Sequence, residues 1–223
     1  METGRAIFIP GWGARGRFYA RGLPPGFEAV EPPTFRHARS LRHFRTWLAA
    51  EIARRPGPVV LAGHSMGGAL ALLAASENPD AVAALVLFSP AGLPVTKPMA
   101  RSLAAFASHL ADRRFPLRDG LASAGSVVRA PRAALRVARE VRALDLSAAM
   151  RRVRRAGIPV TVISCDSDTL VTPAGCRQTA ALLGAELVEL PVTGGHLWMF
   201  TQWQPFTDAL VTATARTRAA SPA

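Results

Sequence analysis

The feature that most constrains this chain is a serine between glycines, where a predicted strand meets a predicted helix. Val59–Ala62 is an apolar run typical of a buried strand, and residues 69–76 are rich in Ala and Leu, which favours a helix. The six residues between them, GHSMGG, place three glycines around Ser65. A strand that turns directly into a helix needs a tight, strained turn, with neighbours that have almost no side chain. We therefore expect Ser65 at the tip of a strand–helix turn.

Strands and helices alternate along the rest of the chain. Apolar runs predict strands at 6–10, 59–62, 83–88, 158–164 and 186–190, with a weaker one at 27–31. Helical spacing predicts helices at 40–54, with Ser40 as its N-cap, and at 69–76, 174–183 and 206–215. Such alternation predicts an α/β fold with a doubly wound, mostly parallel sheet. No N-terminal hairpin is expected before the strand at 6–10.

The pattern changes between residues 94 and 157, where no strand is predicted and several helical stretches are rich in arginine. The clearest stretch has an apolar stripe, with arginines on a different face of the helix. The stripe consists of Ala134, Val137, Ala138, Val141 and Leu144. We expect a core formed by residues 1–93 and 158–223, into which residues 94–157 are inserted as a helical cap.

A serine hydroxyl is a weak nucleophile at neutral pH and needs a general base. His196, in TGGHLWMF, follows the last predicted strand and therefore lies at the same edge of the sheet as Ser65. His64 directly precedes the serine, and its side chain is expected to point away from it. We predict that His196 is the base.

An imidazole base needs a carboxylate that orients it and stabilises its charged form. Asp166 and Asp168 both follow the strand at 158–164, at the edge where open α/β sheets place their sites. We favour Asp168, with Asp166 as the alternative. The backbone N–H groups of Met66 and of Trp12, in PGWG, are the expected oxyanion donors. The indole of Trp12 is expected either to line an acyl pocket or to serve packing alone.

Together these motifs resemble the α/β-hydrolase superfamily over essentially the whole chain. PGWG stands where the oxyanion motif of the family occurs, and GHSMGG matches its nucleophile elbow. DTLVTP resembles the acid loop, and GGHLWMF resembles the histidine loop. Pro10 replaces the usual histidine of the oxyanion motif, which leaves a hole made of backbone N–H groups intact. The combination of these loops with a small Arg-rich cap is similar, more narrowly, to pimeloyl-carrier-protein methyl ester esterases.

The formal net charge of +12 is concentrated in the predicted cap, which contains 14 of the 27 Lys and Arg residues and 4 of the 15 Asp and Glu residues. No nucleic-acid-binding motif accompanies this internal basic segment, which argues against a nucleic-acid partner. The narrower resemblance implies that cap arginines hold an acidic acyl carrier. Arg136 and Arg139 are the expected substrate-binding arginines, and a solvated helix face is the alternative interpretation.

The resemblance implies a serine hydrolase that cleaves a carboxylic ester or thioester through an acyl-enzyme on Ser65. Acyl transfer, C–C hydrolysis or perhydrolysis on the same residues are alternatives, and a non-catalytic binding protein is a further one. No run reaches the roughly 20 apolar residues of a membrane span. The first residues lack the features of a signal peptide, so a cytoplasmic location is expected. Cys165 and Cys176 match no common zinc motif, and neither a metal nor a cofactor is expected.

Overall fold

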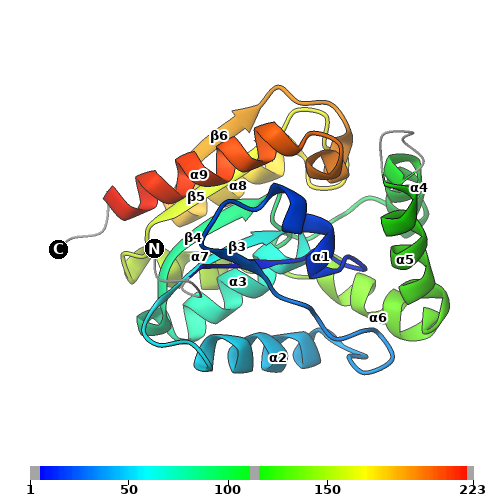
Figure 1. Ribbon diagram of the computed structural model, residues 1–223, viewed down its shortest axis with the longest axis horizontal. Helices are drawn as coiled ribbons and strands as arrows, with labels where there is room; N and C mark the ends of the chain where they lie inside the picture. Colours follow the sequence, from blue (N-terminus) through cyan, green and yellow to red (C-terminus); the bar gives the residue numbers. More distant parts are fainter. Residues whose placement is uncertain (1–5, 111–115, 220–223) are drawn as a thin grey trace.

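The computed structural model describes residues 6–110 and 116–219, and its centre is a six-stranded sheet in the order β2-β1-β3-β4-β5-β6 (Figure 1). Every pair of neighbouring strands is parallel. The strands are β1 (Ala6–Ile9), β2 (Phe27–Ala29), β3 (Val59–His64), β4 (Val82–Phe88), β5 (Val160–Cys165) and β6 (Glu186–Leu190). The doubly wound parallel sheet predicted from the alternation of strands and helices is confirmed.

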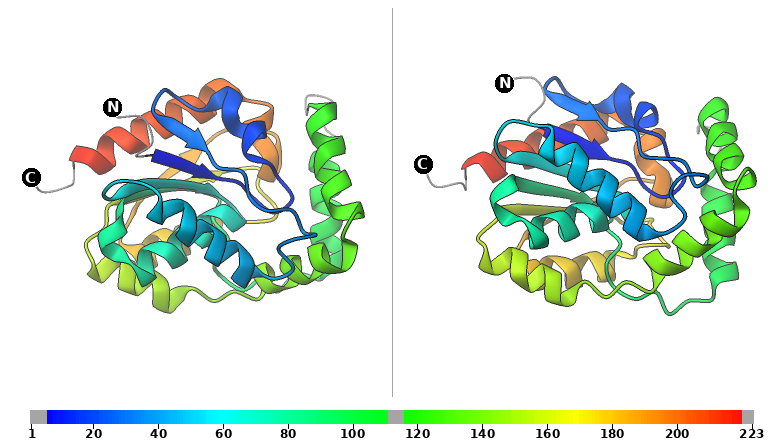
Figure 2. Two further views of the ribbon diagram at one scale, coloured as in Figure 1. Left: turned by 60° about the horizontal axis from the view of Figure 1, so that its bottom comes forward. Right: turned by 90° about the horizontal axis from the view of Figure 1, so that it is seen from below.

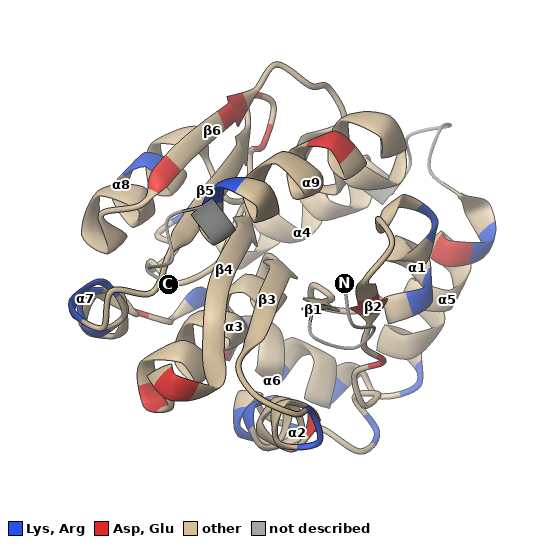
Figure 3. Ribbon diagram, turned by 60° about the vertical axis from the view of Figure 1, so that its left-hand side comes forward, with Lys and Arg blue, Asp and Glu red and all other residues tan. Residues whose placement is uncertain are grey.

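Helices cover both faces of this sheet, as Figure 3 shows in a view across the strands. One face is covered by α2 (Leu41–Ala53), α3 (Met66–Glu77), α7 (Ser147–Arg155) and α8 (Pro173–Leu183). The other face is covered by α1 (Gly16–Tyr19), the short helix η1 (Ala20–Gly22) and α9 (Trp203–Ala219). The remaining short helices are η2 (Pro79–Ala81) and η3 (Gly195–Phe200). Because the helices lie on both faces, β3 and β4 are apolar along almost their whole length.

The first turn of α2 is held by a residue that is distant in the sequence. Ser40 occupies the N-cap position, but its hydroxyl bonds the Nδ1 atom of His43 at 2.8 Å rather than a backbone N–H. The carboxylate of Glu140 instead accepts from the backbone N–H of Leu41 at 2.6 Å. A carboxylate at a helix N-terminus is favourable because it meets unpaired N–H groups and the positive end of the helix dipole. This contact ties the inserted helices to the core.

The inserted segment contains α4 (Met99–Leu110), α5 (Leu117–Val128) and α6 (Pro131–Arg142), followed by α7. Figure 2 shows α4 and α5 standing together at one end of the molecule, beside the sheet. In contrast, α7 packs against α3 and α8, and its Met150 and Val153 are fully buried. The helical excursion therefore consists of α4–α6, while α7 returns to the layer that covers the sheet.

Candidate active site

The predicted strand–helix turn is present, and Ser65 stands between β3 and α3 with φ 54° and ψ −115°. A non-glycine residue rarely adopts a positive φ, so the turn is strained. The glycines that flank the serine are required because a side chain at either position would collide with the backbone. A Cβ at Gly67 would collide with the carbonyl group of Ile9, and one at Gly63 would lie 2.6 Å from the backbone of Gly67. The glycines therefore allow β1, β3 and α3 to approach closely around Ser65.

Asp168 lies behind His196 and holds its ring by a direct hydrogen bond. The Nδ1–H group of His196 donates to Oδ2 of Asp168 at 2.7 Å, and both side chains are buried. Because a carboxylate can only accept here, Nδ1 carries the proton and Nε2 is left as the basic nitrogen. His196 and Ser65 line the same cavity. Within the described residues, the His196 side chain is bonded to Asp168 and its backbone carbonyl to His64, and no side-chain bond joins His196 to Ser65.

The structure distinguishes between the two aspartates after β5. Oδ1 of Asp168 accepts from the backbone N–H groups of Leu170 at 2.8 Å and Val171 at 3.0 Å, so the whole carboxylate is oriented. Burial acts to raise the pKa of Asp168, but the charge and hydrogen bond of His196, together with the Leu170 N–H bond, outweigh it and lower the pKa. Asp166 is exposed on the same loop. Asp168 is therefore the carboxylate that contacts His196.

A buried hydrogen-bond network centred on His64 was not predicted from the sequence. Nε2 of His64 lies 3.0 Å from the backbone carbonyl of His196, so it must be the donor. Nδ1 then accepts from the hydroxyl of Tyr19 at 2.8 Å, and the Tyr19 oxygen accepts from the N–H of Gly11 at 3.4 Å. Burial, and next the charge of His196, hold the pKa of His64 well below its usual value, which keeps the ring neutral. The network connects the oxyanion loop, the elbow and the histidine loop.

Trp12 stands in the PGWG loop and lines the cavity. Its indole N–H donates to the carbonyl of Ala134 in α6 at 3.0 Å, and its ring packs against Phe35 and Phe106. The indole therefore serves both packing and the cavity wall. Met66, the second expected oxyanion residue, is the first residue of α3, where backbone N–H groups have no partner within the helix.

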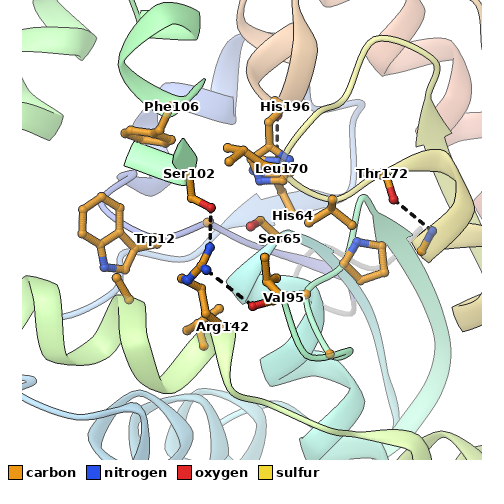
Figure 4. A pocket seen from close by; sticks show the side chains of 18 of the residues that line it. Trp12, His64, Ser65, Val95, Ser102, Phe106, Arg142, Leu170, Thr172 and His196 are labelled. Carbon is orange, nitrogen blue, oxygen red and sulfur yellow. Dashed lines mark hydrogen bonds between the residues drawn. The ribbon is translucent and has the colours of Figure 1, made fainter. Parts of the chain in front are cut away.

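Figure 4 shows the residues of a partly open cavity between the core and the inserted helices. Its volume is about 440 Å³. The core contributes Ser65, His196 and Trp12, and α4 contributes Phe106 and Leu103. The charged side chains of the lining are two cations, Lys97 and Arg142, and among the described residues no carboxylate joins them. Most of the other lining side chains are apolar, as is usual for small-molecule sites.

The arginine at the cavity is Arg142, which the sequence analysis did not single out. Its guanidinium donates to the hydroxyl of Ser102 and to the carbonyl groups of Val95 and Lys97, which fixes the segment leading into α4. Arg136 and Arg139 are exposed and lie outside the cavity lining. Arg136 forms an ion pair with Glu140 at 3.0 Å.

The two cysteines are buried free thiols. Burial raises the pKa of Cys176 to about 12, so this thiol stays protonated at neutral pH and is a poor nucleophile. Among residues 6–110 and 116–219, no group of His, Cys, Asp and Glu side chains is arranged to hold a metal ion. In the same part of the chain, no helix has the length and apolar character needed to cross a membrane.

The sequence was compared with the models of known protein families. The model of the alpha/beta hydrolase family matches residues 6–209. The chain belongs to this family. The resemblance seen in its motifs is thus confirmed at the level of the superfamily.

Individual relatives are similar to this α/β hydrolase to different extents. A curated relative, lipase LipV of Mycobacterium tuberculosis, is 63% identical over 35 residues, which are 16% of this chain and 13% of the lipase. The solved structure of a bromoperoxidase, BpoC of M. tuberculosis, covers 95% of this chain and 92% of its own, with 20% identity and a TM-score of 0.68. An enol-lactonase from Burkholderia xenovorans covers 94% and 90%, with 19% identity and a TM-score of 0.72. At these identities the two structures support the fold alone.

Proposed function

We propose that this α/β hydrolase cleaves carboxylic esters or thioesters through an acyl-enzyme on Ser65. The observation that carries the proposal is the bond from His196 Nδ1 to Asp168, which leaves Nε2 as a base in the cavity that also contains the strained Ser65. A base held by an oriented carboxylate, in the same cavity as a hydroxyl on a strained turn, is the arrangement expected of an activated serine.

The proposed reaction has two halves. The Ser65 oxygen attacks the acyl carbon while Nε2 of His196 takes the hydroxyl proton, and the negative oxygen is held by the N–H groups of Met66 and Trp12. His196 then gives its proton to the leaving alcohol or thiol, which departs and leaves Ser65 acylated. In the second half, His196 removes a proton from water, the water oxygen attacks the acyl carbon, and the acid leaves as the proton returns to Ser65.

The cavity favours an apolar acyl group. It is lined mostly by apolar side chains, and its volume of about 440 Å³ lies within the range of small-molecule sites. Trp12, Phe106 and Leu103 would contact the acyl chain. We therefore expect hydrolysis to improve as the acyl chain lengthens until the cavity is filled.

A series of p-nitrophenyl esters of increasing acyl length, followed by acyl-CoA thioesters, tests this function. Ser65→Ala is the matched control, since it removes only the hydroxyl oxygen. The proposal expects turnover by the wild type and almost none by the variant. Equal turnover by both would refute it. Adding alcohol, amine or peroxide acceptors distinguishes hydrolysis from acyl transfer and perhydrolysis, because transfer to an acceptor would exceed release of the free acid.

A carrier-linked substrate is the finer form of this proposal. Arg136 and Arg139 are exposed on α6, so they are available to a large anionic partner rather than to the acyl group in the cavity. Charge reversal at Arg139 should raise KM for acyl-carrier-protein substrates and leave KM for p-nitrophenyl esters unchanged. If the KM for acyl-carrier-protein substrates is the same in the variant and in the wild type, Arg139 has no role in carrier binding.

A further inference from the structure

Exposed apolar side chains are concentrated on two cap helices. Among the side chains that the structure describes, five large hydrophobic ones are exposed. Four of them are on α4 and α5: Leu103 (44% exposed), Leu117 (76%), Leu121 (65%) and Val128 (75%). The fifth, Val211 (48%), is on α9. Large exposed apolar patches on soluble domains mark contact surfaces, whereas single residues such as Val211 need no explanation.

The apolar side of α5 faces solvent and its polar side faces the protein, which is the reverse of an ordinary surface helix. Leu117, Leu121 and Val128 are spaced so that they fall on one side of the helix, and this side faces solvent. On the opposite side, the polar residues Asp119 and Ser123 are buried against the protein. A helix of a globular protein normally directs its apolar side inward. The outward stripe of Leu117, Leu121 and Val128, about 16 Å long at 1.5 Å per residue, is called the α5 stripe below.

The charges beside the α5 stripe are positive. Arg118 and Arg129 are both exposed, and each follows a residue of the stripe, so helix geometry places them on the same flank of it. Asp119 is the only acidic residue in the described parts of α4 and α5, and its side chain is 12% exposed, 3.7 Å from Arg118. The exposed surface of α5 therefore combines an apolar stripe with a cationic flank.

We propose that α5 binds an anionic lipid surface, with the α5 stripe inserted among the acyl chains and Arg118 and Arg129 among the headgroups. Helices that lie in a membrane interface have this combination, and their binding grows with buried apolar area and with attraction to anionic lipid. A second copy of the chain fits less well, because a symmetric contact would bring the same arginines together. In the described parts of α4 and α5, the one carboxylate is that of Asp119, which already pairs with Arg118 and leaves Arg129 without an acidic partner on this helix.

The location of α5 also relates this surface to the cavity. Ser123 of α5 and Leu103 and Phe106 of α4 line the cavity that contains Ser65. A cap seated on lipid would hold this cavity next to the bilayer, where an ester with a long acyl chain is concentrated. This consequence for the substrate rests on the proposed ester hydrolysis, but the binding itself does not.

Flotation of the full chain with vesicles tests the proposal without any measurement of catalysis. Vesicles of phosphatidylcholine with phosphatidylglycerol are compared with vesicles of phosphatidylcholine alone. We expect binding to the anionic vesicles that weakens as salt is added. Leu121→Asp combined with Val128→Asp should lower the bound fraction at least tenfold, and Arg118→Glu combined with Arg129→Glu should do the same on anionic vesicles. The matched control is Val211→Asp, which places the same charge at an exposed apolar position on α9 and should bind like the wild type.

Hydrolysis of a short, soluble p-nitrophenyl ester and thermal unfolding are measured on every variant, so that loss of the fold is recognised. A wild type that does not float with anionic vesicles overturns the proposal. So does equal loss of binding in Val211→Asp, or a change from dimer to monomer in Leu121→Asp, which would assign the stripe to a second copy. If the wild type floats but hydrolyses no ester, lipid binding stands and the proposed function fails.

Discussion

The carboxyl edge of the sheet and the cap helices α4 and α5 are built in contrasting ways. At the sheet edge, each candidate catalytic side chain is fixed by several neighbours: Asp168 by two backbone N–H groups and His196, and Ser65 by a strained turn between glycines. In the cap, α4 approaches the histidine loop where His109 packs against Gly195, and α5 exposes large apolar residues. The candidate catalytic side chains thus belong to the core, while most of the exposed large apolar side chains that the structure describes belong to the inserted helices.

This contrast has an energetic consequence. A change at the sheet edge alters groups that are buried and have many partners, so its cost in activity or stability is large. A change in the cap alters exposed or half-buried groups, so it should affect binding or local order more than global stability. The following predictions test this difference.

The largest effect is expected at Asp168. Asp168→Asn removes the acceptor that fixes the proton on Nδ1 of His196, which should lower kcat by about 10⁴-fold in analogy with other triads. Asp166→Asn is the matched control, two residues away on the same loop, and should change kcat less than twofold because Asp166 is exposed. Steady-state kinetics on a p-nitrophenyl ester measure both. A larger loss in the Asp166 variant would transfer the acid role to that residue.

A large loss of stability is expected at Gly67. Gly67→Ala places a methyl group against the Ile9 carbonyl, where backbone must shift, and should lower the free energy of unfolding by about 3 kcal/mol. Gly175→Ala, in the first turn of α8, is the control, because its new Cβ would lie no closer than 3.6 Å to its nearest neighbour, Thr172. Urea unfolding followed by circular dichroism gives both values. Similar stabilities for the two variants would show that the elbow is less tightly packed than described.

Below pH 6.5 the buried His64 should make the protein less stable. Burial lowers the pKa of this ring in the folded state, so the unfolded chain binds a proton that the folded protein does not. Stability is therefore complete above the unfolded value of 6.5 and falls with pH below it, by at most about 1.4 kcal/mol per pH unit for this group. His64→Gln keeps a donor for His196 and an acceptor for Tyr19 and should reduce the slope. An unchanged slope would mean that other groups cause it.

The smallest global effect is expected in the cap at Arg142. Arg142→Met removes the bonds to Ser102, Val95 and Lys97, so residues 95–102 should exchange amide hydrogens faster. We expect KM for p-nitrophenyl esters to rise about threefold to tenfold, with a change in unfolding free energy below about 1 kcal/mol, because Arg142 is only half-buried and its bonds run to the segment that leads into α4. Hydrogen exchange followed by mass spectrometry is the measurement. Uniform acceleration across the sheet would contradict the separation of cap and core.

Local sequence signals predicted the core well. The strands at 59–62, 83–88, 158–164 and 186–190 all appear within one or two residues, because buried parallel strands are continuous apolar runs. The elbow at Ser65 was predictable from the glycines on both sides of the serine, although the structure shows that Gly67 is required by a tertiary contact with Ile9. The contact between His196 and Asp168 followed from the chain order and from the shared edge of a parallel sheet.

Features that depend on tertiary contacts were not predictable in the same way. Ser40 satisfies the local pattern of an N-cap, but Glu140, a hundred residues later, makes the backbone bond. The network of Tyr19 and His64 joins three loops, and no local spacing indicates it. Arg142 reaches the cavity while Arg136 and Arg139 remain on the outside, since the direction of each arginine depends on how α6 packs.

Labelling with a fluorophosphonate probe tests the central claim, an activated Ser65, most directly. The rate of labelling is followed by intact mass, and the modified residue is located by peptide mapping. We predict a single adduct on Ser65 in the wild type, none in Ser65→Ala, and labelling at least a hundredfold slower in His196→Ala. Labelling of Ser65 at the same rate in the wild type and His196→Ala would contradict the account, as would an adduct on any other serine.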